Sequence, residues 1–263
     1  MTTVITFGQQ KGGAAKTTSA AVTAYLLSMD QKVLLVDFDP QGNATELITQ
    51  MPTKEFEGKS VMEAIRKGEA ADFVYNVMEN FWLLPATDDL SEFASYIYDE
   101  AQIPKGKRAK VLQKTLASIM NRFDYIIIDT PPSLGELTVN ALATSDYVVV
   151  MFEPSKFCYS AIERFLVDTL DIKERANSSL EVAGILPVLL DFRRGDIKDY
   201  LELIEEEYPG LMFDTKIKRK AATARLSISG FLNNPELTQA AEPYDLFVEE
   251  LLERTKRGVG ISG

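Results

Sequence analysis

Residues 10–18 have the types and spacing needed to hold a phosphate group. They follow the apolar run of residues 3–7, so the pattern predicts a strand that breaks into a glycine-containing loop and then continues as a helix. Glycine lets backbone N–H groups approach phosphate oxygens, and the N-terminus of the helix adds the positive end of its dipole. Lys16 would neutralise β- and γ-phosphate charge, and the Thr17 hydroxyl would bind Mg²⁺. The segment therefore predicts a site for a nucleoside triphosphate.

This loop departs from the strict pattern G-x-x-x-x-G-K-[ST], because Gln10 and Ala15 occupy its two glycine positions. Residues 11–18 instead resemble the deviant Walker A box of the ParA/MinD superfamily, K-G-G-x-x-K-[ST]-T. The resemblance implies that Lys11 reaches across a dimer to the partner's nucleotide and is catalytic together with Lys16. It also implies ATP binding by Lys11, Gly12, Gly13, Ala14, Ala15, Lys16, Thr17 and Thr18. The alternative is a glycine turn that caps an ordinary helix.

Ala15 stands where members of this superfamily usually carry glycine. An added methyl group near the β-phosphate would narrow the loop or forbid a conformation with φ > 0. We therefore expect ATP binding through this loop to be weaker, and turnover to be slower, than in a relative with glycine at this position.

Two further apolar runs end in carboxylates. Residues 32–36 lead into Asp37 and Asp39, and residues 125–128 lead into Asp129. Runs of this kind are typical of parallel strands that are buried on both faces. Because the carboxyl ends of parallel strands meet at one edge of a sheet, these three acids are expected to lie beside the phosphate loop.

The same two segments resemble the Walker A′ and Walker B boxes of the ParA/MinD superfamily. The resemblance implies that Asp39 is catalytic and positions the attacking water. It also implies that Thr17, Asp37 and Asp129 serve Mg²⁺, with Asp37 supporting either the ion or the loop. In the alternative interpretation, Asp37 or Asp39 only caps the helix that follows residue 43.

Strands and helices alternate along the rest of the chain. Further strands are predicted at residues 82–86, 147–154 and 184–190, and helices at residues 17–29, 61–67, 110–121, 160–170 and 197–207. The alternation predicts an α/β fold with a doubly wound, mostly parallel sheet and helices on both faces. Residues 133–142 resemble the superfamily's switch segment, so the implied fold is a P-loop NTPase of the deviant Walker type.

Length and composition add expectations about domains and chemistry. The chain has 263 residues, 46% of them hydrophobic, and is expected to form one ATPase domain over residues 1–263, without an N-terminal helix-turn-helix domain because the phosphate loop begins so early. Residues 101–110 are expected to be a loop. With no histidine and one cysteine, Cys158, the chemistry rests on carboxylates, lysines and water, which suits phosphoryl transfer. No signal peptide or membrane-spanning run is apparent, so a cytoplasmic location is expected.

The net charge of −11 argues against nucleic-acid binding by the whole surface. A local basic patch is predicted in residues 216–225, which contain no acid. Its members are Lys216, Lys218, Arg219, Lys220 and Arg225. ParA-type proteins bind DNA non-specifically as ATP-bound dimers, so the resemblance implies DNA binding through this patch. Further candidates for DNA contacts are Arg193 and Arg194, and the group Lys105, Lys107, Arg108 and Lys110. The alternative is an ordinary solvated face.

The resemblance covers most of the chain and implies a ParA/Soj-type partition ATPase. Such a protein would hydrolyse ATP weakly without its partner, form a homodimer on ATP, bind DNA on the nucleoid and respond to a centromere-binding, ParB-type adaptor. Two alternatives stay open: MinD-like positioning at a membrane, against which the C-terminal Glu249, Glu250 and Glu253 argue, and a regulatory module in which Ala15 has impaired turnover. The contacts to the adenine base are not assigned.

Overall fold

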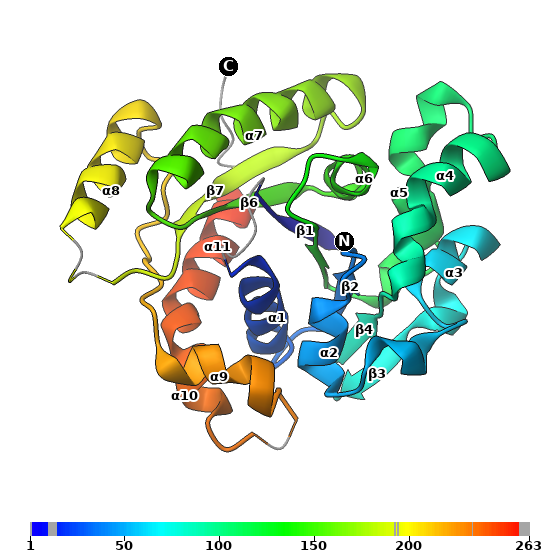
Figure 1. The fold of residues 1–263 in the computed structure, drawn as a ribbon, viewed down its shortest axis with the longest axis horizontal. Coiled ribbons are helices and arrows are strands. Elements are labelled where there is room, and N and C mark those ends of the chain that lie inside the picture. The colour runs from blue at the N-terminus through cyan, green and yellow to red at the C-terminus, as the bar shows by residue number, and fades with distance from the viewer. Residues whose placement is uncertain (1, 10–14, 192, 194, 233, 258–263) are drawn as a thin grey trace.

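The computed structural model describes residues 2–9, 15–191, 193, 195–232 and 234–257. Within them, strands form a seven-stranded sheet in the order β3-β4-β2-β5-β1-β6-β7 (Figure 1). The strands are β1 Thr3–Gly8, β2 Val33–Asp37, β3 Tyr75–Met78, β4 Phe81–Leu84, β5 Tyr125–Asp129, β6 Tyr147–Phe152 and β7 Glu181–Pro187. Every neighbouring pair is parallel except β3 with β4, so the predicted doubly wound, mostly parallel α/β fold is confirmed.

The central strands are continuous apolar runs, which is why they can be buried on both faces. All of β2 is buried, and β1, β5 and β6 are buried beyond their first residue. The register places Asp129, the last residue of β5, beside Phe7 of β1 and beside Asp37, the last residue of β2. The ends of these three strands therefore meet at one edge of the sheet.

Helices cover both faces of the sheet. Helices α1, α2, α9, α10 and α11 share one apolar cluster with strand residues such as Ile5 and Leu35, whereas α3 to α8 pack on the opposite face against residues such as Val4 and Leu34. Figure 1 shows α1 and α11 side by side on their face. The helices are α1 Lys16–Leu27, α2 Asn43–Thr49, α3 Val61–Lys67, α4 Phe93–Ser95, α5 Val111–Leu116, α6 Glu136–Thr144, α7 Lys156–Arg175, α8 Asp196–Glu207, α9 Ala221–Ser229, α10 Leu237–Ala241 and α11 Asp245–Arg257. No helix in the described part of the chain is long and apolar enough to cross a membrane.

Two local predictions differ from the structure, and one strand was not predicted. The helix expected at residues 110–121 is confined to α5, because Ile119 leaves the helical conformation and is buried in the core. Strand β7 ends at Pro187 because Leu189 adopts a left-handed conformation with φ 55°. The edge strand β3 was not predicted; it pairs with β4 through a tight turn in which Asn80 has φ 59°.

Candidate functional site

Helix α1 begins at Lys16, directly after the predicted phosphate loop. Its N-cap residue, Ala15, has φ 53° and ψ 24°, and its side chain makes no capping hydrogen bond to the helix. The first N–H groups of α1 are therefore left for another acceptor, an arrangement that suits an anion. The predicted ligands Lys11, Gly12, Gly13 and Ala14 lie outside the described residues.

The left-handed conformation of Ala15 corrects one expectation. The methyl group does not forbid φ > 0 at this position, because alanine adopts it in the folded chain. It does make the conformation costly, by about 1–2 kcal/mol for an L-residue other than glycine. Glycine at position 15 would adopt this conformation without strain.

Lys16 lies at the centre of the site and is buried, with 7% of its surface exposed. Burial lowers the pKa of Lys16 from its usual range, while the negative charges of Asp129 and Asp39 oppose that change. Beside Lys16 is a cavity of about 450 Å³, lined by Ala15, Lys16, Thr17, Thr18, Asp39, Gln41, Asn43, Glu46, Leu47 and Pro132. The predicted ligands Lys16, Thr17 and Thr18 therefore share one cavity with the predicted catalytic Asp39.

Asp129 is fully buried, and neither of its carboxylate oxygens accepts a hydrogen bond of normal geometry in the described structure. Burial and, to a smaller extent, the charge of the adjacent Asp37 raise the pKa of Asp129 to about 8, while the Thr17 hydroxyl and Lys16 act in the opposite direction. A buried carboxylate without a partner is costly, and a divalent cation or its bound water would satisfy it. The residues present therefore fit Mg²⁺ near Asp129 and Thr17.

Asp37 is also fully buried, but its oxygens are occupied. Oδ2 accepts hydrogen bonds from the N–H and the hydroxyl of Thr45, each at 2.7 Å, and Oδ1 accepts one from the N–H of Asp39 at 3.3 Å. Burial raises the pKa of Asp37 to about 6, against the effect of the two bonds from Thr45. Because Thr45 lies in the first turn of α2, Asp37 makes the helix-capping contact of the alternative interpretation.

Asp39 follows β2 and reaches the cavity through a short turn. Its Oδ1 accepts a hydrogen bond from the N–H of Gln41 at 3.0 Å, which orients the carboxylate, and the residue is 6% exposed. Asp39 is also among the charges that act on Lys16 and on Asp129. The structure thus brings together Lys16, Thr17, Asp37, Asp39 and Asp129, as the motif spacing predicted.

Sequence reasoning missed two residues at this edge of the sheet. Gln9, which precedes the predicted loop, is 2% exposed, and neither of its amide atoms has a hydrogen-bond partner among the described residues. Leu189, with φ 55°, lines a second cavity of about 370 Å³ that shares Ala15 and Thr18 with the first. The signal for Gln9 was available, because it is the first long polar residue after the apolar run of β1, whereas nothing in the sequence marks Leu189 as left-handed.

Three of the five members of the predicted basic patch are paired in space with acids from other segments. Lys220 forms an ion pair with Glu242, Arg225 with Glu236 at 2.9 Å, and Arg219 with Glu153 at 3.6 Å. Of the other members, Lys216 donates to the carbonyl of Asp214, and Lys218 borders the second cavity. Arg193 pairs with Asp191 at 2.5 Å, and Arg194 lies outside the described residues.

A helix α1 that begins directly after β1 and the predicted phosphate loop, with acids at the ends of β2 and β5, is the arrangement of a P-loop nucleoside triphosphatase. A protein-family profile described as an AAA domain matches residues 2–182, and the chain belongs to that family. An uncharacterised protein of Pseudomonas putida is 33% identical over 98% of this chain and 97% of its own length. The chromosome partitioning protein ParA of Myxococcus xanthus is 30% identical over 95% of this chain and 88% of its own length. These matches confirm the predicted ParA/Soj-type family, for which ATP hydrolysis is the general activity.

The fold is shared with a solved structure that carries a different functional name. The crystal structure of cobyrinic acid a,c-diamide synthase from Mycobacterium smegmatis with bound ADP and magnesium has a TM-score of 0.82 and 30% identity. The match covers 99% of this chain and 98% of that one. Because one fold carries both names, the fold alone does not define a cargo or a partner.

Proposed function

We propose that this chain is an ATPase of a DNA partition system, in which ATP and Mg²⁺ drive formation of a homodimer that binds DNA without sequence specificity. The observation that supports this most strongly is the convergence of Lys16, Asp39 and the unpartnered Asp129 beside the N-terminus of α1. The cluster offers a cation and N–H groups to a triphosphate, and carboxylates to water and a metal. We treat residues 1–263 as one ATPase domain, since the described helices pack on a single sheet.

The phosphates are assigned to the first cavity. In this proposal the backbone of residues 12–15 and the side chains of Lys16, Thr17 and Thr18 hold them. Bound Mg²⁺ would neutralise developing phosphate charge, held by the Thr17 hydroxyl and by Asp129, directly or through water. Asp37 supports this site through its bonds to Thr45.

Asp39 is proposed to position the attacking water, because it lines the cavity and its carboxylate is oriented by Gln41. Lys11 is proposed to act in trans on the partner's phosphates, as an arginine finger does in other phosphoryl-transfer enzymes. An interaction made in the transition state changes turnover more than ground-state affinity. Removal of the Asp39 carboxylate should therefore trap the ATP-bound dimer.

The nucleoside half of ATP is assigned to the second cavity. It continues from the first at Ala15 and Thr18 and is closed by Leu189, Ile217 and Tyr244. The apolar side chains of Leu189 and Ile217 suit the faces of a base, and the backbone around residues 217–220 offers groups to its edge. The sequence left the contacts to the adenine base unassigned, and this proposal assigns them to the second cavity.

DNA binding is proposed to involve the basic residues of 216–225, which would exchange their present carboxylate partners for DNA phosphates. Exposed ion pairs such as Arg225 with Glu236 and Lys220 with Glu242 are worth about 0–1 kcal/mol each, so DNA phosphates could displace the carboxylates at little cost. A two-fold dimer would double the number of cations that face one duplex. The ATP-bound dimer would then be cytoplasmic and nucleoid-associated, with turnover kept low until a ParB-type adaptor binds.

The test is the molar mass of the protein in solution by light scattering, with and without ATP–Mg²⁺. We expect the mass to double with ATP–Mg²⁺, the dimer to be lost in Lys11→Ala and to persist for longer in Asp39→Ala. Lys59→Ala, an exposed lysine that lines neither nucleotide cavity, should behave like the unmodified protein. A mass that never changes with ATP–Mg²⁺ would refute the proposed cycle, and flotation with anionic vesicles in the same samples would identify membrane binding instead.

A further inference from the structure

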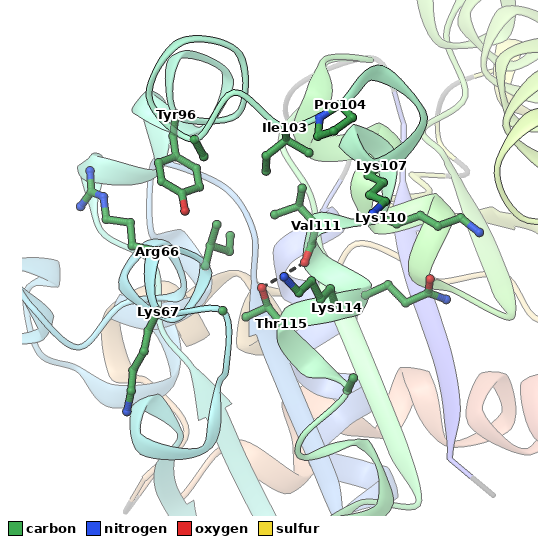
Figure 2. Close-up of a pocket in the computed structure, with 15 residues that line it drawn as sticks. Arg66, Lys67, Tyr96, Ile103, Pro104, Lys107, Lys110, Val111, Lys114 and Thr115 are labelled. Carbon is green, nitrogen blue, oxygen red and sulfur yellow. Dashed lines mark hydrogen bonds between the residues drawn. The ribbon is translucent and has the colours of Figure 1, made fainter.

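A third cavity lies between α3 and α5 and has no lining residue in common with the two nucleotide cavities. Its volume is about 670 Å³, which is within the range of sites for drug-sized ligands. Ile65, Ile103 and Val111 supply apolar walls, and Figure 2 shows the Tyr96 ring reaching into the space between them. The cavity can therefore bury the apolar body of a small molecule.

The charged residues around this cavity are all basic. Arg66 and Lys67 are already paired, Arg66 with Glu63 and Glu92 and Lys67 with two further acids, and Figure 2 shows both side chains extending away from the cavity.

The opposite wall carries Lys107, Lys110 and Lys114. None of the three has a carboxylate within ion-pair distance in the described part of the chain, and Figure 2 shows Lys114 directed inward, below Tyr96. The hydroxyl of Tyr96 has no hydrogen bond to any described residue. In a protein of net charge −11, a wall of unpaired lysines beside a free hydroxyl selects for an anionic group.

The backbone around the cavity is unusual in two ways. Residues Tyr96–Glu100 form a π-helical turn, closed by a hydrogen bond from the N–H of Ala101 to the carbonyl of Tyr96 at 2.8 Å. Gln102, which follows, has φ 47°. π-turns and left-handed residues other than glycine are uncommon and occur often at ligand sites, where the surrounding structure holds them in place.

The lysine wall is held rigidly by α6. The Asn140 side chain accepts hydrogen bonds from the N–H groups of Val111 and Leu112, at 2.9 and 3.2 Å, and donates to the carbonyl of Arg108 at 3.0 Å. The guanidinium of Arg108 lies 4.3 Å from the centre of the Tyr98 ring. Because these contacts already fix the segment that carries the lysines, ligand binding would cost little conformational entropy.

We propose that this cavity binds a small organic anion, with its apolar body against Ile65, Ile103 and Val111 and its carboxylate, sulfonate or phosphate held by Lys107, Lys114 and the Tyr96 hydroxyl. The proposal does not depend on the function proposed above, because it shares no residue with the nucleotide site. Lys110 lies at the rim of the cavity and adds to the positive electrostatic potential inside it.

The experiment uses 8-anilinonaphthalene-1-sulfonate as probe, in the presence of saturating ATP–Mg²⁺ so that the nucleotide cavities are covered. Its uncharged counterpart, N-phenyl-1-naphthylamine, has the same apolar body without the sulfonate. We expect one saturable fluorescent site for the sulfonate, and affinity at least about tenfold lower in Lys107→Glu/Lys114→Glu, since each exposed pair contributes up to about 1 kcal/mol and reversal replaces attraction with repulsion. The uncharged probe should bind both proteins alike.

Lys105→Glu is the matched control, because Lys105 belongs to the same 3₁₀ segment, Lys105–Lys110, but does not line the cavity. Its effect should stay within about twofold, as for a remote screened charge. The proposal would be overturned if the control and the double variant lost the same affinity for the sulfonate probe. It would also be overturned if neither variant changed that affinity. Displacement of the probe by duplex DNA would assign the lysines to a DNA surface and also overturn it. If the double variant does not fold, Lys107→Gln/Lys114→Gln gives the same comparison.

Discussion

Replacing Ala15 with glycine separates two effects of the methyl group, one on folding and one on nucleotide binding. Ala15 is left-handed in the folded chain before any nucleotide is considered, so the cost of that conformation falls on folding. Relief of the strain gains about 1–2 kcal/mol. Glycine also makes the unfolded chain more flexible, which lowers the free energy of unfolding by about 0.4–1 kcal/mol. We expect a net gain in unfolding free energy of about 0.5–1 kcal/mol, because the methyl group also packs partly against the core.

The effect on nucleotide affinity has a different origin. Ala15 lines both the cavity assigned to the phosphates and the cavity assigned to the nucleoside, so its methyl group stands where the two halves of ATP would join. Removing it should tighten ATP–Mg²⁺ binding by about two- to fivefold, which corresponds to roughly 0.5–1 kcal/mol. Turnover should rise with it, because a better-seated triphosphate is closer to the reactive geometry.

The assays are urea unfolding for stability and isothermal titration calorimetry for ATP–Mg²⁺ affinity. Asn80→Gly is the matched control: Asn80 has φ 59° in the β3–β4 turn, remote from either nucleotide cavity, so its replacement should leave affinity unchanged. A glycine variant at position 15 with unchanged stability would refute the strain argument. Unchanged or weaker affinity would show that the methyl group does not approach the nucleotide.

Three further outcomes follow from buried and paired groups. Because the folded-state pKa of Asp129 is raised to about 8, this group stabilises the nucleotide-free fold at low pH, and its contribution is lost as pH rises from about 4 to 8. Asp129→Asn should remove this contribution, so the difference in unfolding free energy between the variant and the unmodified protein should change between pH 5 and pH 8 in urea unfolding, by on the order of a few kcal/mol. Asn140→Ala should destabilise the protein by about 2–4 kcal/mol in the same assay, because two buried N–H groups at the start of α5 lose their acceptor, whereas the exposed Asn76→Ala should cost under about 0.5 kcal/mol. Glu236→Gln/Glu242→Gln should strengthen ATP-dependent DNA binding in filter binding at low salt, and an unchanged affinity would show that Arg225 and Lys220 are not DNA contacts.

The edge of the sheet that carries Asp37, Asp39 and Asp129 could be predicted from sequence because the pattern that defines it is local and periodic. An apolar run that ends in an acid predicts a buried strand with a carboxylate at its end, and parallel pairing then brings Asp37 beside Asp129. The roles of the two acids could not be separated in this way. Their difference depends on Thr45, whose hydroxyl and N–H satisfy Asp37, whereas the oxygens of Asp129 accept no hydrogen bond of normal geometry from the described residues.

The basic patch shows the opposite case. Residues 216–225 contain no acid in sequence, but the fold brings Glu153, Glu236 and Glu242 against them from other elements. Ion pairing between distant segments leaves no periodic signal in the chain, so net local charge is a poor guide to the field at a surface. The cavity between α3 and α5 was hidden for the same reason, because its walls come from separate segments.

An acidic protein that binds anions has to keep its own carboxylates away from the binding positions. The nucleotide site meets this requirement with buried carboxylates that are either hydrogen-bonded, as Asp37 is, or kept largely protonated until a cation arrives, as the raised pKa of Asp129 indicates. The lysine wall between α3 and α5 meets it by having no acid among its lining residues. The 216–225 segment meets it only in part in the described structure, because Arg219, Lys220 and Arg225 are already paired with acids. DNA binding there therefore requires the carboxylates to be displaced, and a second subunit that doubles the available phosphate contacts is the natural way to favour that exchange.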